Sequence, residues 1–194
     1  MLTRLARVLI TSLLTALPLI GPASAETRVA SWNIRNLGWD NGKDYASLAE
    51  IGRYFDLISV QEVMSEEGIA RLETALEART GADWDRLCSH LIGRGSYREM
   101  YCFTWRADAV SWVEGAVVYT DDRDVFAREP FSAVFETYDQ VRFVATGVHS
   151  IYGDSVEVRE AEARALRSYH DWLRASFPGL PVLLMGDFNL PPTN

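Results

Sequence analysis

Polar side chains follow four apolar segments of the chain, and each of them can bind a metal ion or move a proton. Residues 181–192 read P-V-L-L-M-G-D-F-N-L-P-P, so Asp187 and Asn189 follow a short apolar run. One such ending indicates little, because turns favour aspartate. Three other apolar segments also end in groups of this kind, at Asn33, Glu62 and His149. We therefore predict that these side chains meet at one edge of the fold and form a catalytic site.

The chemistry of these side chains suits a hard divalent cation and a phosphate. Glu62 with Asn33 offers carboxylate and amide oxygens, which Mg²⁺ or Ca²⁺ prefers and which suit zinc poorly. His149 can accept or donate a proton near neutral pH. Asp187 could orient a nucleophile or the metal, and Asn189 could donate a hydrogen bond to a phosphate oxygen. The set predicts metal-assisted hydrolysis of a phosphodiester.

Two arginines could hold a phosphate group through the fork of the guanidinium, namely Arg35 and Arg128. A surface ion pair is the alternative role for Arg128. The overall charge does not favour the binding of a phosphate, because the chain has 19 basic and 27 acidic residues and a formal net charge of −8. An acidic protein does not hold nucleic acid by bulk attraction. Local arginines and a divalent cation would have to supply the positive charge.

Amphipathic helices alternate with strands along the chain. Asp44 is expected to cap a first helix, and Ser65 a second one that ends before Gly81. A third helix, which Pro178-Gly179 would end, carries an apolar stripe of Val158, Ala161, Ala165, Tyr169, Trp172 and Leu173. Strands are predicted over 27–33, 56–62, 84–92, 99–106, 109–119, 131–136, 140–148 and 181–187.

The strand pattern indicates an α/β (α+β) fold. The apolar runs 57–60 and 182–185 are continuous, so both faces of these strands require cover. Two sheets packed on each other, with helices outside, meet that requirement.

Residues 1–25 read as a secretory signal peptide that precedes a single domain over 26–194. Arg4 and Arg7 give a positive start, an apolar stretch follows, and Ala23-Ser24-Ala25 is a cleavage signal. A membrane anchor is the alternative, but the stretch contains Pro18 and is shorter than the roughly 20 residues of a span. We expect a secreted or periplasmic protein without stable membrane association after cleavage.

Cys88 and Cys102 flank a G-R-G-S turn and lie at equal distances from residue 95. They would face each other on neighbouring strands of a hairpin. In an oxidising compartment a disulfide between them is plausible. Two buried free thiols are the alternative.

Several motifs together resemble the endonuclease/exonuclease/phosphatase superfamily, and within it the deoxyribonuclease I family. They are S-W-N-I-R-N-L-G (31–38), V-Q-E-V (60–63), I-G-R-G-S-Y-R-E-M-Y (92–101), A-R-E-P (127–130), G-V-H-S (147–150) and L-M-G-D-F-N (184–189). The resemblance implies a four-layer helix–sheet–sheet–helix sandwich.

The resemblance also implies a role for each site residue. Asn33 and Glu62 resemble a metal site for Mg²⁺, with Ca²⁺ or Mn²⁺ as alternatives. His149 resembles a catalytic histidine whose partner is Glu99. Tyr97 and Arg128 resemble residues near the scissile phosphate, and Arg35 resembles a substrate contact. Asp187 and Asn189 resemble groups that act on the phosphate and the transition state.

Other readings of single residues stay open beside the resemblance. Tyr97 could be a packed aromatic of a hairpin. His90 and His170 have no motif around them and are interpreted as structural or solvated. The acidic segment 121–124 is interpreted as a solvated turn, although such a loop can hold Ca²⁺ in this family.

The sequence departs from the family pattern in two places. Family members carry a second histidine in a Ser-Asp-His segment on a last strand, and this sequence ends before one, at Asn194. We therefore expect a truncated domain with at most feeble activity and, because a strand edge would lie open, poor solubility. Met64 stands where relatives often have a basic DNA contact, which argues against duplex DNA as substrate.

We expect a secreted, monomeric, divalent-metal-dependent nuclease that hydrolyses nucleic acid. A phosphatase or lipid phosphodiesterase on the same scaffold is one alternative. A binding protein that has lost catalysis is another.

Overall fold

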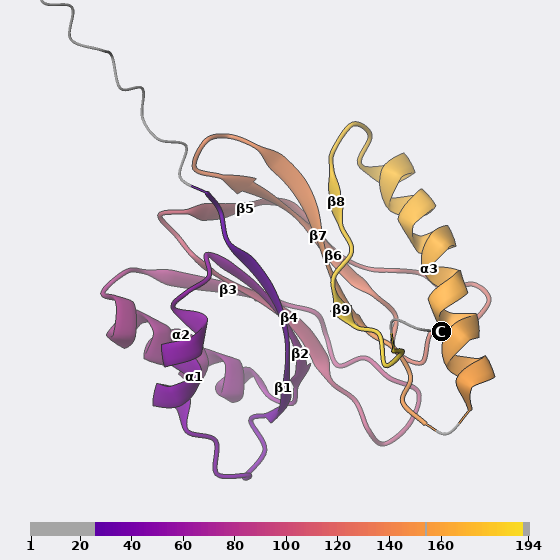
Figure 1. Cartoon of the computed structure of the whole chain (residues 1–194), viewed down its shortest axis with the longest axis horizontal. Coiled ribbons are helices and arrows are strands. Elements are labelled where there is room, and N and C mark those ends of the chain that lie inside the picture. Colours follow the sequence, from indigo (N-terminus) through magenta and orange to yellow (C-terminus); the bar gives the residue numbers. More distant parts are fainter. Residues whose placement is uncertain (1–25, 154, 192–194) are drawn as a thin grey trace, which may run out of the picture.

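The computed structural model describes residues 26–153 and 155–191 (Figure 1). The signal peptide expected over 1–25 lies outside the described residues. One sheet has the strand order β1-β2-β4-β3, and the other has the order β5-β6-β7-β8, with β9 also paired to β7. The strands are β1 (Val29–Leu37), β2 (Leu57–Val63), β3 (Trp84–Cys88), β4 (Met100–Arg106), β5 (Val110–Val118), β6 (Phe131–Thr137), β7 (Arg142–His149), β8 (Val182–Leu183) and β9 (Gly186–Asp187). The helices are α1 (Tyr45–Gly52), α2 (Glu66–Thr80) and α3 (Val156–Ser176).

Three apolar clusters separate four layers of secondary structure. The first joins α1 and α2 to the first sheet and includes Ile58 and Leu72. The second fills the space between the sheets, where Phe103 lies against Phe135. The third joins the second sheet to α3 and includes Tyr169. The helix–sheet–sheet–helix sandwich is therefore confirmed (Figure 1).

Local signals fixed the ends of the first two helices. The Asp44 carboxylate accepts the backbone N–H of Ala46, and the Ser65 hydroxyl accepts that of Gly68. Gly81 caps α2 with φ 70°, a left-handed conformation that glycine adopts without strain. All three predicted caps are confirmed.

The predicted inner face of α3 is partly wrong. Val158 is 50% exposed. The buried residues of the helix are Glu162, Leu166, Tyr169 and Leu173. These four residues have helical spacing, but Glu162 is charged. A search for apolar residues alone therefore misses Glu162 and predicts a different buried face.

The last predicted strand, 181–187, is interrupted between β8 and β9. The hydroxyl of Thr146 on β7 donates to the carbonyl of Leu183 and accepts the N–H of Met185, at 3.1 and 2.9 Å. The Thr146 hydroxyl therefore supplies hydrogen bonds to the backbone where the pairing between strands is interrupted. Gly186 has φ 156°, and a Cβ there would meet the carbonyl oxygen of Val148 at 2.0 Å. Only glycine lets β9 approach β7 so closely.

Two further strand predictions need correction. The strand expected over 84–92 ends at Cys88, and Ile92 makes only an isolated bridge with Glu99. β1 does not stop at Asn33 but continues to Leu37, with a shift in register against β2.

The cysteines form a disulfide. Cys88 faces Cys102 in the antiparallel register of β3 and β4, and the two sulfur atoms are bonded. The hairpin geometry expected from the sequence is thus confirmed, and the alternative of two free thiols is wrong.

Removal of this disulfide by Cys88→Ser together with Cys102→Ser should lower the free energy of unfolding by about 3 kcal/mol, because the bond restricts the unfolded chain. Urea unfolding measures the effect. A reducing agent should destabilise the wild type by a similar amount and leave the double variant unchanged. Equal stability of the wild type with and without reductant would contradict the prediction.

Within the described residues, none of the helices combines the length and the hydropathy that crossing a membrane requires.

Candidate active site

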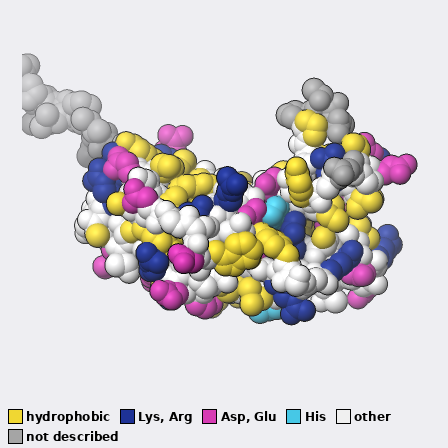
Figure 2. All heavy atoms as spheres, turned by 90° about the horizontal axis from the view of Figure 1, so that it is seen from below, with side chains coloured by type: hydrophobic (Ala, Val, Ile, Leu, Met, Phe, Trp, Pro, Cys, Tyr) yellow, Lys and Arg dark blue, Asp and Glu magenta, His cyan; other side chains and the backbone are white. Residues whose placement is uncertain are grey.

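The predicted polar residues of β1, β2 and β9 meet at one end of the sandwich. The Nδ2 atom of Asn33 donates to Glu62 Oε1 at 2.8 Å and to Asp187 Oδ2 at 3.0 Å. These bonds join the two sheets, since Asp187 belongs to the second one. Figure 2 faces this end, and acidic, basic and apolar side chains meet there around a hollow. The predicted convergence of Asn33, Glu62 and Asp187 is confirmed.

Unusual backbone conformations aim these side chains. Four non-glycine residues of the site have positive φ: Arg35 and Asn36 at 57°, Glu62 at 60° and Asn189 at 49°. Such conformations cost on the order of 1–3 kcal/mol each and persist where surrounding contacts fix them. One such contact is the backbone N–H of Asn36, which donates to Glu62 Oε2 at 3.0 Å.

His149 and Glu99 form a buried pair. Nδ1 of the imidazole lies 2.8 and 3.0 Å from the two carboxylate oxygens of Glu99. On the other side of the ring, Nε2 lies 4.0 Å from Glu62 Oε1 and 3.9 Å from Asp187 Oδ2. Glu99 therefore holds the proton on Nδ1 and leaves Nε2 facing the carboxylates, where it can exchange a proton.

Arg128 is not a surface residue, so its alternative role as a surface ion pair is wrong. Its side chain is 12% exposed, and Nε lies 3.9 Å from a carboxylate oxygen of Glu99. The guanidinium donates to the backbone carbonyl oxygens of His149 and Ser150, at 3.0 and 2.9 Å. Arg128 thus secures the segment that carries the histidine and places a positive charge beside the site.

Two tyrosines surround the pair. The hydroxyl of Tyr97 donates to Asn36 Oδ1 at 3.2 Å, and its ring meets that of Trp39 edge to face. Burial, together with the negative charges of Glu99 and Glu62, raises the pKa of Tyr97 well above its usual value. The phenol therefore stays a proton donor at the edge of the site, not only a packed aromatic.

Tyr101 is a residue that the sequence did not single out. It is buried, and its hydroxyl accepts the backbone N–H of His149 at 3.0 Å. Burial is the main reason why the pKa of Tyr101 lies well above 10, and the charge of Glu99 adds to the shift. Tyr101 fixes the backbone of the histidine.

Asp187 and Asn189 are held in a tight turn after β9. Asp187 Oδ1 accepts the N–H of Asn189 at 3.1 Å, and Asn189 Nδ2 donates to the carbonyl oxygen of Ser150 at 2.7 Å. One amide hydrogen of Asn189 is thus used within the protein. The roles of these two residues in catalysis remain predictions.

The side chain of Arg35 is exposed, and its described contacts are those of its backbone. Its N–H donates to Asn33 Oδ1 at 3.0 Å, and its carbonyl oxygen accepts from Asn41 at 3.5 Å. Its contact with a substrate stays a prediction.

The donor atoms of the site fit Mg²⁺. Glu62 Oε1 and Asp187 Oδ2 both lie within 3.0 Å of Asn33 Nδ2. No group of three or more His, Cys, Asp or Glu side chains that could hold a metal occurs in 26–153 and 155–191. One or two carboxylates completed by water are a usual Mg²⁺ environment. Because the carboxylates of Glu62 and Asp187 approach the same amide of Asn33, Asp187 joins the predicted pair of Asn33 and Glu62 as a candidate ligand.

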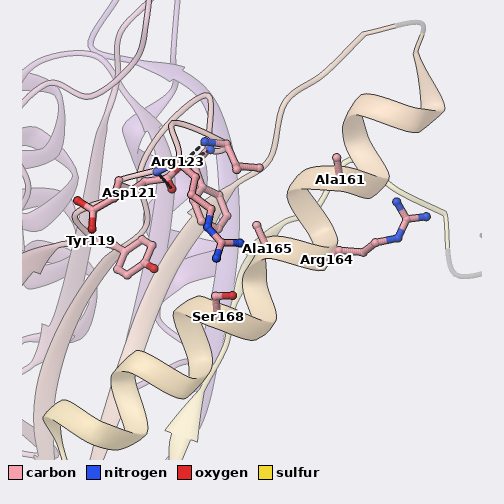
Figure 3. Close-up of a pocket in the computed structure, with 10 residues that line it drawn as sticks. Tyr119, Asp121, Arg123, Ala161, Arg164, Ala165 and Ser168 are labelled. Carbon is pink, nitrogen blue, oxygen red and sulfur yellow. Dashed lines mark hydrogen bonds between the residues drawn. The ribbon is translucent and has the colours of Figure 1, made fainter.

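The remaining sequence predictions concern positions away from the site. His90 is exposed, and His170 lies 3.7 Å from Asp171, which agrees with solvated roles. In the acidic segment, Asp121 accepts backbone N–H groups of residues 123, 125 and 126, as a turn requires. Figure 3 shows the cavity of about 500 Å³ between this segment and α3, which none of the predicted site residues lines.

Comparison with known proteins decides the family. The sequence profile of the Endonuclease/Exonuclease/phosphatase family matches residues 30–194. The chain belongs to this family. Several relatives carry deoxyribonuclease names, among them the following two. Deoxyribonuclease from Thioalkalivibrio sp. (strain K90mix) is 52% identical over 174 residues, which are 88% of this chain and 48% of that protein. Human deoxyribonuclease-1 is 30% identical over 189 residues, which are 91% of this chain and 65% of that protein.

Two solved structures share the fold. The mannosyl-6-phosphatase of Bacteroides thetaiotaomicron superposes with a TM-score of 0.64 at 20% identity, over 87% of this chain and 67% of that one. The human nocturnin catalytic domain with bound sulfate superposes with a TM-score of 0.61 at 15% identity. The superposition covers 87% of this chain and 65% of that one. The chain spans between about half and two thirds of the length of these two deoxyribonucleases.

Proposed function

We propose that this family member is a divalent-metal-dependent phosphodiesterase that hydrolyses nucleic acid. The observation that carries the proposal is the pair of His149 and Glu99 facing the carboxylates of Glu62 and Asp187. The deoxyribonuclease relatives favour nucleic acid as the substrate. The two solved structures named above, at 20% identity or less, support the fold alone.

We propose a task for each side chain of the site. Glu62 and Asp187, with the amide oxygen of Asn33, would hold Mg²⁺, which when bound neutralises charge on the phosphate and lowers the pKa of water. His149 exchanges a proton at Nε2, and Glu99 keeps the ring oriented. The free amide hydrogen of Asn189 and the hydroxyl of Tyr97 can donate to phosphate oxygens. The guanidinium of Arg128 adds positive charge next to Glu99 and the backbone of His149. The exposed side chain of Arg35 is proposed to contact the substrate.

We further propose that the protein works outside the cytoplasm, as a monomer and without stable attachment to a membrane. The leader pattern of residues 1–25 and the disulfide support export. Mass spectrometry of protein recovered from periplasm and medium tests this, and an uncleaved N-terminus would contradict it.

Removal of the metal tests the reaction. Nicking of a supercoiled plasmid in Mg²⁺ should fall to the background of uncatalysed cleavage in excess chelator, and Mg²⁺ added back should restore it, because the donor atoms alone cannot neutralise the phosphate. The His149→Gln variant is the control for contaminating nucleases.

Parallel assays should use RNA, single-stranded DNA, a phosphomonoester and sphingomyelin, with a deoxyribonuclease relative as positive control. Cleavage of a phosphomonoester or lipid without cleavage of any nucleic acid would overturn the proposal. So would a nuclease rate that is the same in chelator.

A further inference from the structure

Glu162 is a buried carboxylate on α3 that binds two backbone segments of the site. Its residue is 1% exposed. One carboxylate oxygen accepts the N–H of Ala127 at 2.7 Å, and the other accepts the N–H of Ile151 at 2.5 Å. A buried charge is costly unless such bonds compensate it. The two residues it binds are neighbours of Arg128 and Ser150.

The peptide group between Ser150 and Ile151 lies at the centre of this arrangement. Its N–H donates to Glu162, and its carbonyl oxygen accepts from Arg128 at 2.9 Å and from Asn189 at 2.7 Å. A peptide group is planar, so a rotation that releases the N–H also turns the carbonyl away. Glu162 also polarises this group, which strengthens the carbonyl oxygen as an acceptor.

The same helix holds Asn189 by a second contact. Arg159, one turn before Glu162, donates from Nη1 to the carbonyl oxygen of Asn189 at 3.0 Å. Helix α3 therefore holds Asn189 in two ways. Arg159 binds the backbone carbonyl of Asn189 directly, and Glu162 orients the 150–151 peptide that the Asn189 side chain binds.

We infer that Glu162 is a positioning residue that holds Arg128 and Asn189 in register with His149 through the 150–151 peptide. The inference rests on the proposed function for its effect on catalysis, but the contacts themselves can be tested without it. Packing does not require a charge here, because the other buried residues of α3 are Leu166, Tyr169 and Leu173. The carboxylate is needed for its two hydrogen bonds, since an apolar residue would leave the N–H groups of Ala127 and Ile151 without an acceptor.

The experiment compares Glu162→Gln with Glu160→Gln in the purified protein. Glu160 lies on the same helix and pairs with Arg164 at the surface, so it is a matched control. A glutamine at 162 can accept only one of the two N–H groups. We expect kcat for plasmid nicking to fall about 10- to 100-fold, as for small misplacements of reacting groups, with KM within about threefold of the wild type. The control should stay within about twofold.

Glu162→Leu separates positioning from stability. It should lower kcat per folded molecule at least as far as Glu162→Gln does, and it should also lower the melting temperature, because the N–H groups of Ala127 and Ile151 both lose their acceptor. A fall in melting temperature with unchanged kcat per folded molecule would overturn the inference, as would a wild-type kcat in Glu162→Gln.

Hydrogen exchange tests the contacts without any substrate. In Glu162→Gln the amides of Ala127 and Ile151 should exchange faster, while those of β6 and β7 keep their protection. Unchanged exchange at both amides would overturn the inference whatever the protein cleaves. Faster exchange together with a wild type that cleaves no nucleic acid would instead refute the proposed function and leave the contacts established.

Discussion

His149→Gln is expected to lower kcat for plasmid nicking by about 10²- to 10⁴-fold, the range typical of a lost proton-transfer group. Glutamine keeps a polar group that can bond to Glu99, but it has no proton to exchange near neutral pH. Nε2 of the histidine lies about 4 Å from both Glu62 and Asp187, so the lost group faces the predicted reaction centre. Steady-state rates in saturating Mg²⁺ measure the effect.

Two variants check that interpretation. Glu99→Gln should reduce kcat less than His149→Gln does, because it removes the orientation and charge behind the ring but not the ring itself. The double variant should be little worse than His149→Gln alone, since the two residues act as one unit. A His149→Gln enzyme within tenfold of the wild type would remove the histidine from the mechanism.

Glu62→Gln should lower the rate at limiting Mg²⁺ by about 10³-fold, the equivalent of roughly 4 kcal/mol of charge stabilisation. The substitution keeps the size of the side chain and an oxygen that can accept from Asn33. It removes one of the two carboxylates that meet at the predicted metal site. Initial rates over a range of Mg²⁺ concentrations should show a higher half-saturating concentration, and calorimetry should show weaker Mg²⁺ binding.

Glu67→Gln is the matched control for Glu62→Gln. Glu67 is exposed in the first turn of α2, and the same loss of charge there should leave the Mg²⁺ dependence unchanged. An identical response of both variants would assign the effect to overall charge. Wild-type Mg²⁺ dependence in Glu62→Gln would place the cation elsewhere.

Local chemistry in the sequence was sufficient for the elements and for much of the site. Asp44, Ser65 and Gly81 mark helix ends because capping acts within one turn. Cys88 and Cys102 indicate their own pairing because the register of a hairpin follows from its turn. The polar ends of apolar strands indicated Asn33, Glu62, His149 and Asp187, whereas Glu99 came from the family resemblance.

Long-range contacts decided what the strand ends actually do. Asn33 bonds to Asp187 across 154 positions of sequence, and His149 meets Glu99 across 50. No local pattern encodes such distances, because the packing of one sheet on the other sets them. The interruption before Gly186 also depends on a partner strand, since Thr146 supplies the bonds at the break.

The sequence by itself determined which chemical groups the protein has, the order of its strands and helices, and the family resemblance that the comparisons confirmed. The tertiary structure alone decided that Arg128 points inward, that Tyr101 supports the histidine, and that Glu162 on α3 serves the site. The physical reason is burial: a charged residue reads as a surface residue in sequence, and only the packed fold supplies the backbone N–H and carbonyl groups that make its burial favourable.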